Sequence, residues 1–422
     1  MAQPLTTHVC PQNRSKDIKV IPDDPVPRDE AIYLASLPPG FCKSVYSNDF
    51  PRPLPEGLHH TDLNPINPTS KLFYSPYMMS SAGQALISKQ PDIIKNRDRS
   101  KSLILLDSGG YQAASGGLVI RSDADRRKIL RWQEQHGEVC VTLDFPTKQP
   151  PNPLKPAPKP QTECLEITLE HLRFYQAERK NPDVYWLNVL QGNDWDFADH
   201  WYTQVKGFDF QSFAIAGPLR KDFHFVMHRL LTMMHDKRLE NMKWLHVLGT
   251  AEVPIALMLS AIQRSINKHV NPDLRISFDT GGPSKLLDSN GISTPLEIDG
   301  NYMVLKTVKA PEGPTHLGSQ APWPWPSALG KHLTMGDVTV RPKQKTSLWR
   351  DPQANYYLGH MNLTTLCDGI AEANRRFKAE TLTGNRTFAF RVAEAADAVE
   401  DIFASGGSRG LLHKHRGLLK AV

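Results

Sequence analysis

The chain has 422 residues, of which 40% are hydrophobic and 22% charged, so it can bury a sizeable core and is too apolar to be disordered throughout. Its formal net charge of +6 permits nucleic-acid binding without requiring it. The first residues lack a basic-then-apolar signal pattern and the apolar runs are short, so we expect a cytoplasmic protein with no membrane partner.

Five cysteines are scattered along the chain, and no two have the Cys-x-x-Cys spacing. An odd number without paired spacing suits a reducing compartment and argues against a disulfide framework. The same pattern argues against a zinc site built from thiolates.

Residues 1–65 are rich in proline, aspartate and lysine and show little periodicity, so we expect an N-terminal extension that lies on the main domain. Beyond it, short apolar runs recur at intervals of roughly 30 residues, the length of a strand–helix unit. The expected strands are 72–76, 103–106, 139–143, 185–190, 212–216, 244–248, 275–278 and 302–305.

Segments with helical periodicity lie between these strands. Ser122 and Asp125 have the spacing of an N-cap with an acidic third residue, and Gly137 is placed to end that helix. Further helices are expected at 163–179, 222–236, 251–267, 362–378 and 391–404.

Eight strands alternating with helices predict a (β/α)8 TIM barrel over residues 66–405, followed by a basic tail at 406–422. A doubly wound open sheet is the alternative, although no glycine-rich dinucleotide fingerprint follows any of the strands.

The decapeptide LILLDSGGYQ, residues 103–112, is the most informative stretch. Asp107 ends a buried apolar run, and Gly109–Gly110 allow a tight turn or the close approach of a ligand. A carboxylate at the end of a buried strand is costly unless it is paired or takes part in chemistry. The alternative is an aspartate that only accepts hydrogen bonds within the turn.

Polar residues and glycines stand at or near the ends of the other strands: Asp144, Gln191 with Gly192, Gly217, His246 and Asp279. In a barrel, residues at the carboxyl ends of the strands converge on one mouth, where the active site is built. Carboxylates can bind Mg²⁺, but no histidine stands in metal-ligand spacing, so we expect no metal. Two carboxylates that act at an anomeric carbon, one as nucleophile and one as acid/base, fit better, and no cofactor is expected.

The motifs DSGGYQ (107–112), TLDFP (142–146), LQG (190–192), FAIAG (213–217), WLHVLGT (244–250) and FD (278–279) follow the order seen in tRNA-guanine transglycosylases. The resemblance covers residues 70–285. It implies a (β/α)8 barrel that exchanges guanine in a nucleic acid for a 7-deazaguanine base.

The resemblance also implies roles for single residues. Asp279 resembles the nucleophile that attacks C1′ of the target nucleoside, and Asp107 resembles the general acid/base. Tyr111 resembles the side chain that stacks on the base, and His246 stands where a second, sandwiching side chain is found. The residues that resemble the base-recognition set are Ser108, Asp144, Gln191, Gly192 and Gly217, the last through its backbone.

Two departures separate the chain from the tRNA enzymes of that family. Those enzymes carry a zinc site of three cysteines and one histidine, whereas residues 310–358 contain no cysteine and only His360 stands near the expected position. In addition, TGGPSK (280–285) replaces the arginine-bearing stretch that follows their nucleophile. The chain therefore resembles the zinc-less, DNA-modifying branch (DpdA-type enzymes), which implies DNA as partner, a preQ0-like base and helper proteins.

Three alternatives stay open at this point. The chain is a tRNA transglycosylase without its zinc site, a non-catalytic accessory subunit, or a glycosidase in which water resolves the intermediate. The Lys- and Pro-rich stretch 147–160 suits either a stiff cationic loop on phosphates or a solvated linker, and the basic residues 409–420 allow the same two interpretations.

Overall fold

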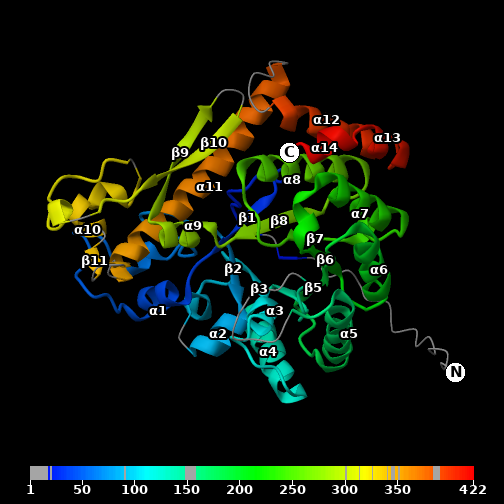
Figure 1. Ribbon diagram of the computed structural model, residues 1–422, viewed down its shortest axis with the longest axis horizontal. Coiled ribbons are helices and arrows are strands. Elements are labelled where there is room, and N and C mark those ends of the chain that lie inside the picture. Colours follow the sequence, from blue (N-terminus) through cyan, green and yellow to red (C-terminus); the bar gives the residue numbers. More distant parts are fainter. Residues whose placement is uncertain are drawn as a thin grey trace.

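We describe the chain from a computed structural model, which covers residues 18–19, 21–89, 92–147, 158–299, 302–312, 314–325, 327–339, 341–343, 347–349, 352–383 and 390–422. Eight parallel strands close into one barrel, each beside the next in the sequence, and the last pairs with the first (Figure 1). They are β1 (Ile32–Ser36), β2 (Tyr77–Ser81), β3 (Leu103–Asp107), β4 (Val139–Val141), β5 (Tyr185–Leu190), β6 (Ser212–Ile215), β7 (Trp244–Val247) and β8 (Arg275–Thr280).

The strands are apolar on both faces because both faces are covered. Alternate residues such as Leu103 and Leu105 fill the barrel interior, while Ile104 and Leu106 pack outward under the helices. The covering helices are α1 (Pro39–Ser47), α2 (Ala82–Ser88), α3 (Gly110–Ala114), α4 (Asp123–His136), α5 (Gln161–Glu178), α6 (Trp195–Val205), α7 (Phe223–His235) and α8 (Val253–His269).

Side-chain caps begin several of these helices. Ser122 accepts a hydrogen bond from the Asp125 N–H at the start of α4, as its spacing predicts, and Asp194 caps α6 in the same way. Short 3-10 turns complete the connections: η1 (His60–Leu63), η2 (Ile93–Asn96), η3 (Pro218–Lys221), η4 (Leu239–Asn241), η5 (Leu286–Ser289), η6 (Pro314–His316) and η7 (Gly330–His332).

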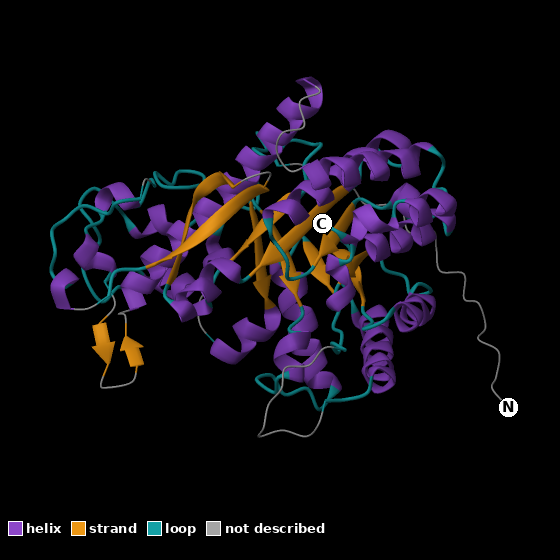
Figure 2. Cartoon of the chain, turned by 45° about the horizontal axis from the view of Figure 1, so that its top comes forward, coloured by secondary structure: helices purple, strands orange, loops and turns teal. Residues whose placement is uncertain are grey.

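The chain after β8 lies outside the barrel. Strands β9 (Gly291–Asp299) and β10 (Tyr302–Lys309) form an antiparallel ribbon that packs against the long helix α11 (Pro352–Thr383), as Figure 2 shows. Helix α12 (Phe390–Ala404) lies on α8. The remaining elements are α9 (Gly282–Lys285), α10 (Met335–Val338), β11 (Arg341–Lys343), β12 (Ser347–Trp349), α13 (Arg409–Lys414) and α14 (Arg416–Lys420).

The closed barrel confirms the predicted fold class, but two of the eight strand assignments are wrong. Residues 72–76 form a loop that ends at Pro76, which has no N–H to give to a strand ladder, and the strand begins at Tyr77. Residues 302–305 belong to β10, outside the barrel. The vacant place is taken by β1, so the segment predicted to be an extension (1–65) supplies the first barrel strand. The tail at 406–422 forms α13 and α14, which lie on α7 and α12.

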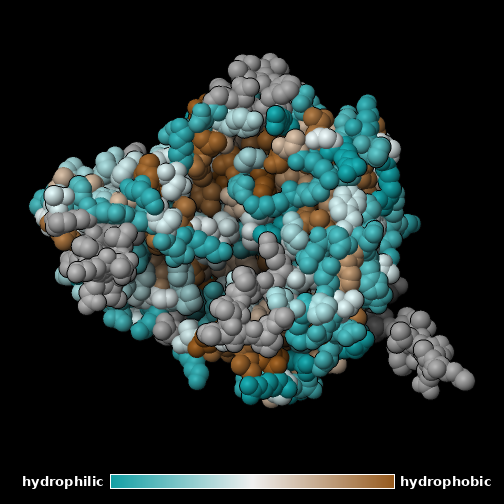
Figure 3. All heavy atoms as spheres, viewed as in Figure 1, coloured by the Kyte–Doolittle hydropathy of each residue, from teal (hydrophilic) through white to brown (hydrophobic). Residues whose placement is uncertain are grey.

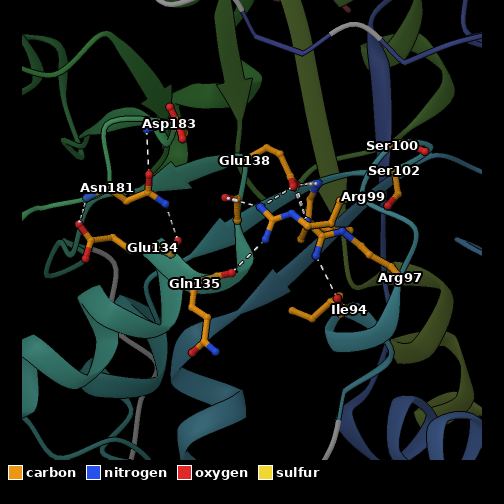
Figure 4. A network of polar contacts seen from close by, with 12 residues as sticks. Ile94, Arg97, Arg99, Ser100, Ser102, Glu134, Gln135, Glu138, Asn181 and Asp183 are labelled. Atoms are coloured by element: carbon orange, nitrogen blue, oxygen red, sulfur yellow. Dashed lines mark hydrogen bonds and ion pairs between the residues drawn. The ribbon is translucent and has the colours of Figure 1, made fainter.

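Ion pairs hold the connections at the amino end of the barrel, opposite the mouth (Figure 4). Arg97 Nη2 lies 2.5 and 2.6 Å from the two carboxylate oxygens of Glu138, and Arg99 reaches the same carboxylate at 2.7 Å. Glu138 also accepts the Ile104 N–H at 2.9 Å, which joins the start of β4 to β3. The Arg97 side chain is 1% exposed, so this pair is buried, and we assign it to stability.

Within the ranges listed above, no helix is both long and apolar enough to cross a membrane.

Candidate active site

The predicted site residues come together at the carboxyl end of the barrel, here called the mouth. Asp107 ends β3, Asp144 follows β4, Gln191 follows β5, Gly217 follows β6 and Asp279 lies near the end of β8. Because all eight strands run in parallel, these positions share one end of the barrel. The closeness of the three carboxylates shows in their mutual effects, since the charge of Asp279 acts on Asp107 and that of Asp107 on Asp144.

Asp279 is held by one of its two carboxylate oxygens. Its Oδ1 accepts the Gly249 N–H at 2.8 Å and contacts Nε2 of His246 at 3.2 Å. Gly249 has a φ of +70°, a conformation that a residue with a β-carbon adopts only with strain. The hydrogen bonds described for Asp279 all fall on Oδ1, so Oδ2 is the oxygen left to react with a substrate.

A chain of hydrogen bonds sets the tautomer of His246. The Trp244 indole, which can only donate, gives its N–H to Ser277 Oγ at 2.7 Å. The Ser277 hydroxyl lies 2.8 Å from His246 Nδ1, and its hydrogen is best placed on that nitrogen. Nε2 then carries the remaining ring proton and donates it to Asp279, because an unprotonated Nε2 would face the carboxylate oxygen lone pair to lone pair.

This arrangement differs from the base-sandwiching role expected for His246. The residue is 0% exposed and both ring nitrogens are engaged below Asp279, so the ring presents no open face to a base. His246 therefore orients the carboxylate. Tyr111, in contrast, is 58% exposed on α3, just beyond Asp107, and its ring is free to stack on a ligand.

Asp107 has a different environment from Asp279. Its Oδ2 accepts the Gly109 N–H at 3.0 Å and the Ser81 hydroxyl at 3.2 Å. Burial raises the pKa of Asp107, and the nearby charge of Asp279 raises it further, against the opposing effect of hydrogen bonds from Gly109, Ser81 and Ser108. The buried site thus favours the protonated form of Asp107.

Asp144 and Gln191 form a buried polar pair. Gln191 Nε2 donates to Asp144 Oδ2 at 2.7 Å, and its Oε1 lies 3.5 Å from the Thr147 hydroxyl. Burial raises the pKa of Asp144 to about 7, and the charge of Asp107 adds to the effect. Ser108 is fully buried beside Asp107, and its hydroxyl has no hydrogen-bond partner in the described chain, so it is available to a ligand.

The two glycines of the predicted set allow close backbone approaches. A β-carbon on Gly192 would lie 2.6 Å from Ala198 of α6, so only glycine fits there. A β-carbon on Gly217 would lie 3.2 Å from Gln191 Oε1, and Gly217 has a φ of +74°. Both glycines therefore let the backbone pass close to the neighbouring side chains next to Gln191.

Sequence reasoning missed Ser277, Gly249 as a donor, and Arg220. Arg220 donates to the Gly217 carbonyl oxygen at 2.5 Å and to the Gly249 carbonyl oxygen at 3.0 Å, so it ties the loop after β6 to the loop after β7. Burial lowers the pKa of Arg220, and the charge of Asp279 opposes this. Gly249 lies inside the motif WLHVLGT, but nothing in the sequence marks Arg220 as part of the mouth.

Two further expectations concern the surroundings of the site. Of the stretch 147–160, residues 148–157 lie outside the described residues. His360 lies within α11 and is buried, and neither ring nitrogen has a hydrogen-bond partner there. In the described part of the chain, no group of three or more His, Cys, Asp or Glu side chains is arranged to hold a metal ion.

Comparison of the sequence with protein-family models and with curated proteins finds no match. The interpretation of the site therefore depends on its geometry and on the motifs named above.

Proposed function

We propose that this chain is a DNA-guanine transglycosylase that exchanges guanine in DNA for a 7-deazaguanine base through a covalent aspartyl-glycosyl intermediate. The observation that carries the proposal is a pair of buried carboxyls at one mouth, each held by two hydrogen-bond donors on a single oxygen. On Asp279 both donors reach Oδ1, which leaves Oδ2 to attack as a nucleophile, and burial raises the pKa of Asp107, which suits a general acid.

The reaction then has two displacements at C1′. Asp279 Oδ2 attacks C1′ as the bond to N9 of guanine breaks, and protonated Asp107 gives its proton to the departing base. Asp107, now a carboxylate, removes the N9 proton of the incoming base, whose nitrogen attacks C1′ and releases Asp279. Two inversions at one carbon retain the configuration of the glycosidic bond.

Base selection is assigned to the pair on the neighbouring strands. Burial raises the pKa of Asp144 to about 7, so above that pH Asp144 is a carboxylate that accepts the N–H and amino protons of a guanine-like edge. Gln191 both donates and accepts beside it. Ser108 offers a hydroxyl with no other partner, and Tyr111 offers a stacking face. The target nucleotide has to leave its stack to reach this depth.

DNA is favoured over tRNA because the sequence has no cysteine in residues 310–358, where the tRNA enzymes that it resembles carry their zinc ligands. An accessory, non-catalytic subunit is the weaker alternative, since such a subunit has no need of both carboxyls at the mouth.

The experiment that tests the proposal offers purified protein DNA and tRNA side by side, with labelled guanine or 7-cyano-7-deazaguanine. Label that enters DNA alone is the expected result. Label that enters tRNA alone would overturn the choice of substrate, and label in neither, with and without cell extract as a source of helper proteins, would overturn the proposal.

A further inference from the structure

A hollow of about 620 Å³ lies beside Asp279 and is distinct from the base-recognition residues. Gly249 and Thr280 line the hollow. Gly249 donates its N–H to Asp279, and Thr280 follows Asp279 in the chain. Its volume lies within the usual range for ligand pockets, about 300–1,000 Å³. Asp279 itself does not line the hollow, so a molecule attached at its carboxylate would reach this ligand-sized space past Gly249 and Thr280.

The far wall of the hollow is apolar. It is formed by Leu257 of α8, Met303 and Leu305 of β10, and Leu366 of α11. Figure 3 shows hydrophobic surface in the upper centre of the molecule, in the region where Figure 1 places β10 and α8. Tyr302, which is 51% exposed, also lines the hollow and adds an aromatic ring.

The near rim is cationic. Lys285 of α9 is exposed, and its Cε lies 3.6 Å from the point that a β-carbon on Gly281 would occupy, two residues after Asp279. No ion pair is found for Lys285 within the described ranges, whereas Lys221, across the rim, is paired with Glu252. Lys285 is thus the cation that is free to meet an anion between Asp279 and the apolar wall.

We propose that this hollow binds the nucleotide next to the target guanosine in the same strand, a proposal that rests on the function proposed above. Its base lies against the apolar wall, and the phosphodiester that links it to the target lies at Lys285. A nucleotide joins a flat apolar ring to an anion at a short, fixed separation, which is the pairing that the hollow offers. A DNA strand attached to Asp279 through C1′ always carries such a neighbouring nucleotide, because the two are covalently linked.

The test uses single-stranded oligonucleotides with one guanine, in which the nucleotide on either side is made abasic in turn. Binding is measured by fluorescence anisotropy, and base exchange is measured on the same oligonucleotides. For the unmodified chain, we expect one of the two abasic sites, and not the other, to weaken binding by about tenfold, the loss typical of one stacked base.

Two variants place the effect in the hollow. Val304→Trp adds a ring to the lining of the hollow and should remove the penalty of that abasic site. Ile87→Trp adds the same ring on the exposed side of α2, away from the hollow, and should keep the penalty. Lys285→Glu should weaken binding and lower the slope of log Kd against log salt by about one, whereas Lys237→Glu, after α7 at the other end of the barrel, should not.

The outcomes separate the two proposals. Exchange that proceeds with no penalty from either abasic site, or with equal behaviour of Val304→Trp and Ile87→Trp, would overturn the subsite and leave the proposed function standing. The hollow would then be left to another occupant, such as a protein side chain. If Val304→Trp does not fold, as judged by circular dichroism, Lys285→Glu at the exposed rim decides in its place. Absence of both binding and exchange would overturn both proposals.

Discussion

Replacing Asp144 by asparagine removes a carboxyl whose pKa burial raises to about 7. In the unfolded chain the same carboxyl has a pKa of about 3.9, so the folded protein holds this proton more tightly by about three pKa units. At 1.36 kcal/mol per unit, the preference amounts to about 4 kcal/mol. The asparagine side chain would keep an oxygen to accept the Gln191 N–H but would have no charge to bury.

The sign of the effect follows from proton linkage. Because the folded state binds the proton more tightly, the stabilisation from protonated Asp144 is complete below about pH 4 and is lost as the pH rises to about 7. Asp144→Asn has no such loss. Its free energy of unfolding should therefore rise relative to that of the unmodified protein between pH 4 and 8, by up to about 4 kcal/mol.

Urea unfolding of both proteins at half-unit pH intervals measures this difference. Asp194→Asn is the control, because Asp194 caps α6 from the surface and its hydrogen bond to Phe197 lowers its pKa. The loss in free energy of unfolding caused by Asp194→Asn should stay constant from pH 4.5 to 8 and shrink only at lower pH. A difference for Asp144→Asn that does not change between pH 4 and 8 would refute the buried, proton-holding carboxyl.

Three further predictions test other parts of the molecule. Asp107→Asn should lower the rate of labelled-guanine exchange by about 10²–10⁴-fold at unchanged circular dichroism, and a retained rate would exclude Asp107 as the acid/base. Gly249→Ala, at a φ of +70°, should cost about 1–2 kcal/mol in urea unfolding, and an unchanged midpoint would show that the turn tolerates a β-carbon. Glu138→Gln should cost about 3–5 kcal/mol in the same assay because it leaves the buried Arg97 without its partner charge, and a loss below about 1 kcal/mol would place that pair among weak surface contacts.

The fold could be predicted from strand spacing because each barrel strand is a short apolar run followed by a covering helix. The missed strand at 32–36 and the misassigned strand at 302–305 have a common cause. The apolar run at 32–36 lies among prolines and outside the regular spacing of the later runs, so it was not recognised as a strand. The run at 302–305 is apolar enough to resemble a barrel strand. Periodicity reports that a segment is a strand and does not report its partner.

For the candidate site too, strand order could be predicted from the sequence, but contacts between neighbouring strands and loops could not. Asp107, Asp144, Gln191 and Asp279 could be placed at one mouth because parallel strands put their carboxyl ends together. The orienting role of His246 could not be predicted, since it depends on the register that sets it opposite Ser277. Arg220 could not be predicted either, because its two partners are backbone carbonyls on different loops.

The measurement that tests the central claim most directly is capture of the covalent intermediate. Single-stranded DNA containing guanine is incubated with the protein in the absence of free base, the mixture is denatured, and the adduct is located by peptide mass spectrometry. The account predicts a sugar-linked peptide that contains Asp279, one guanine released per adduct, and no adduct with Asp279→Asn. An adduct on another residue, or base exchange that persists in Asp279→Asn, would contradict it.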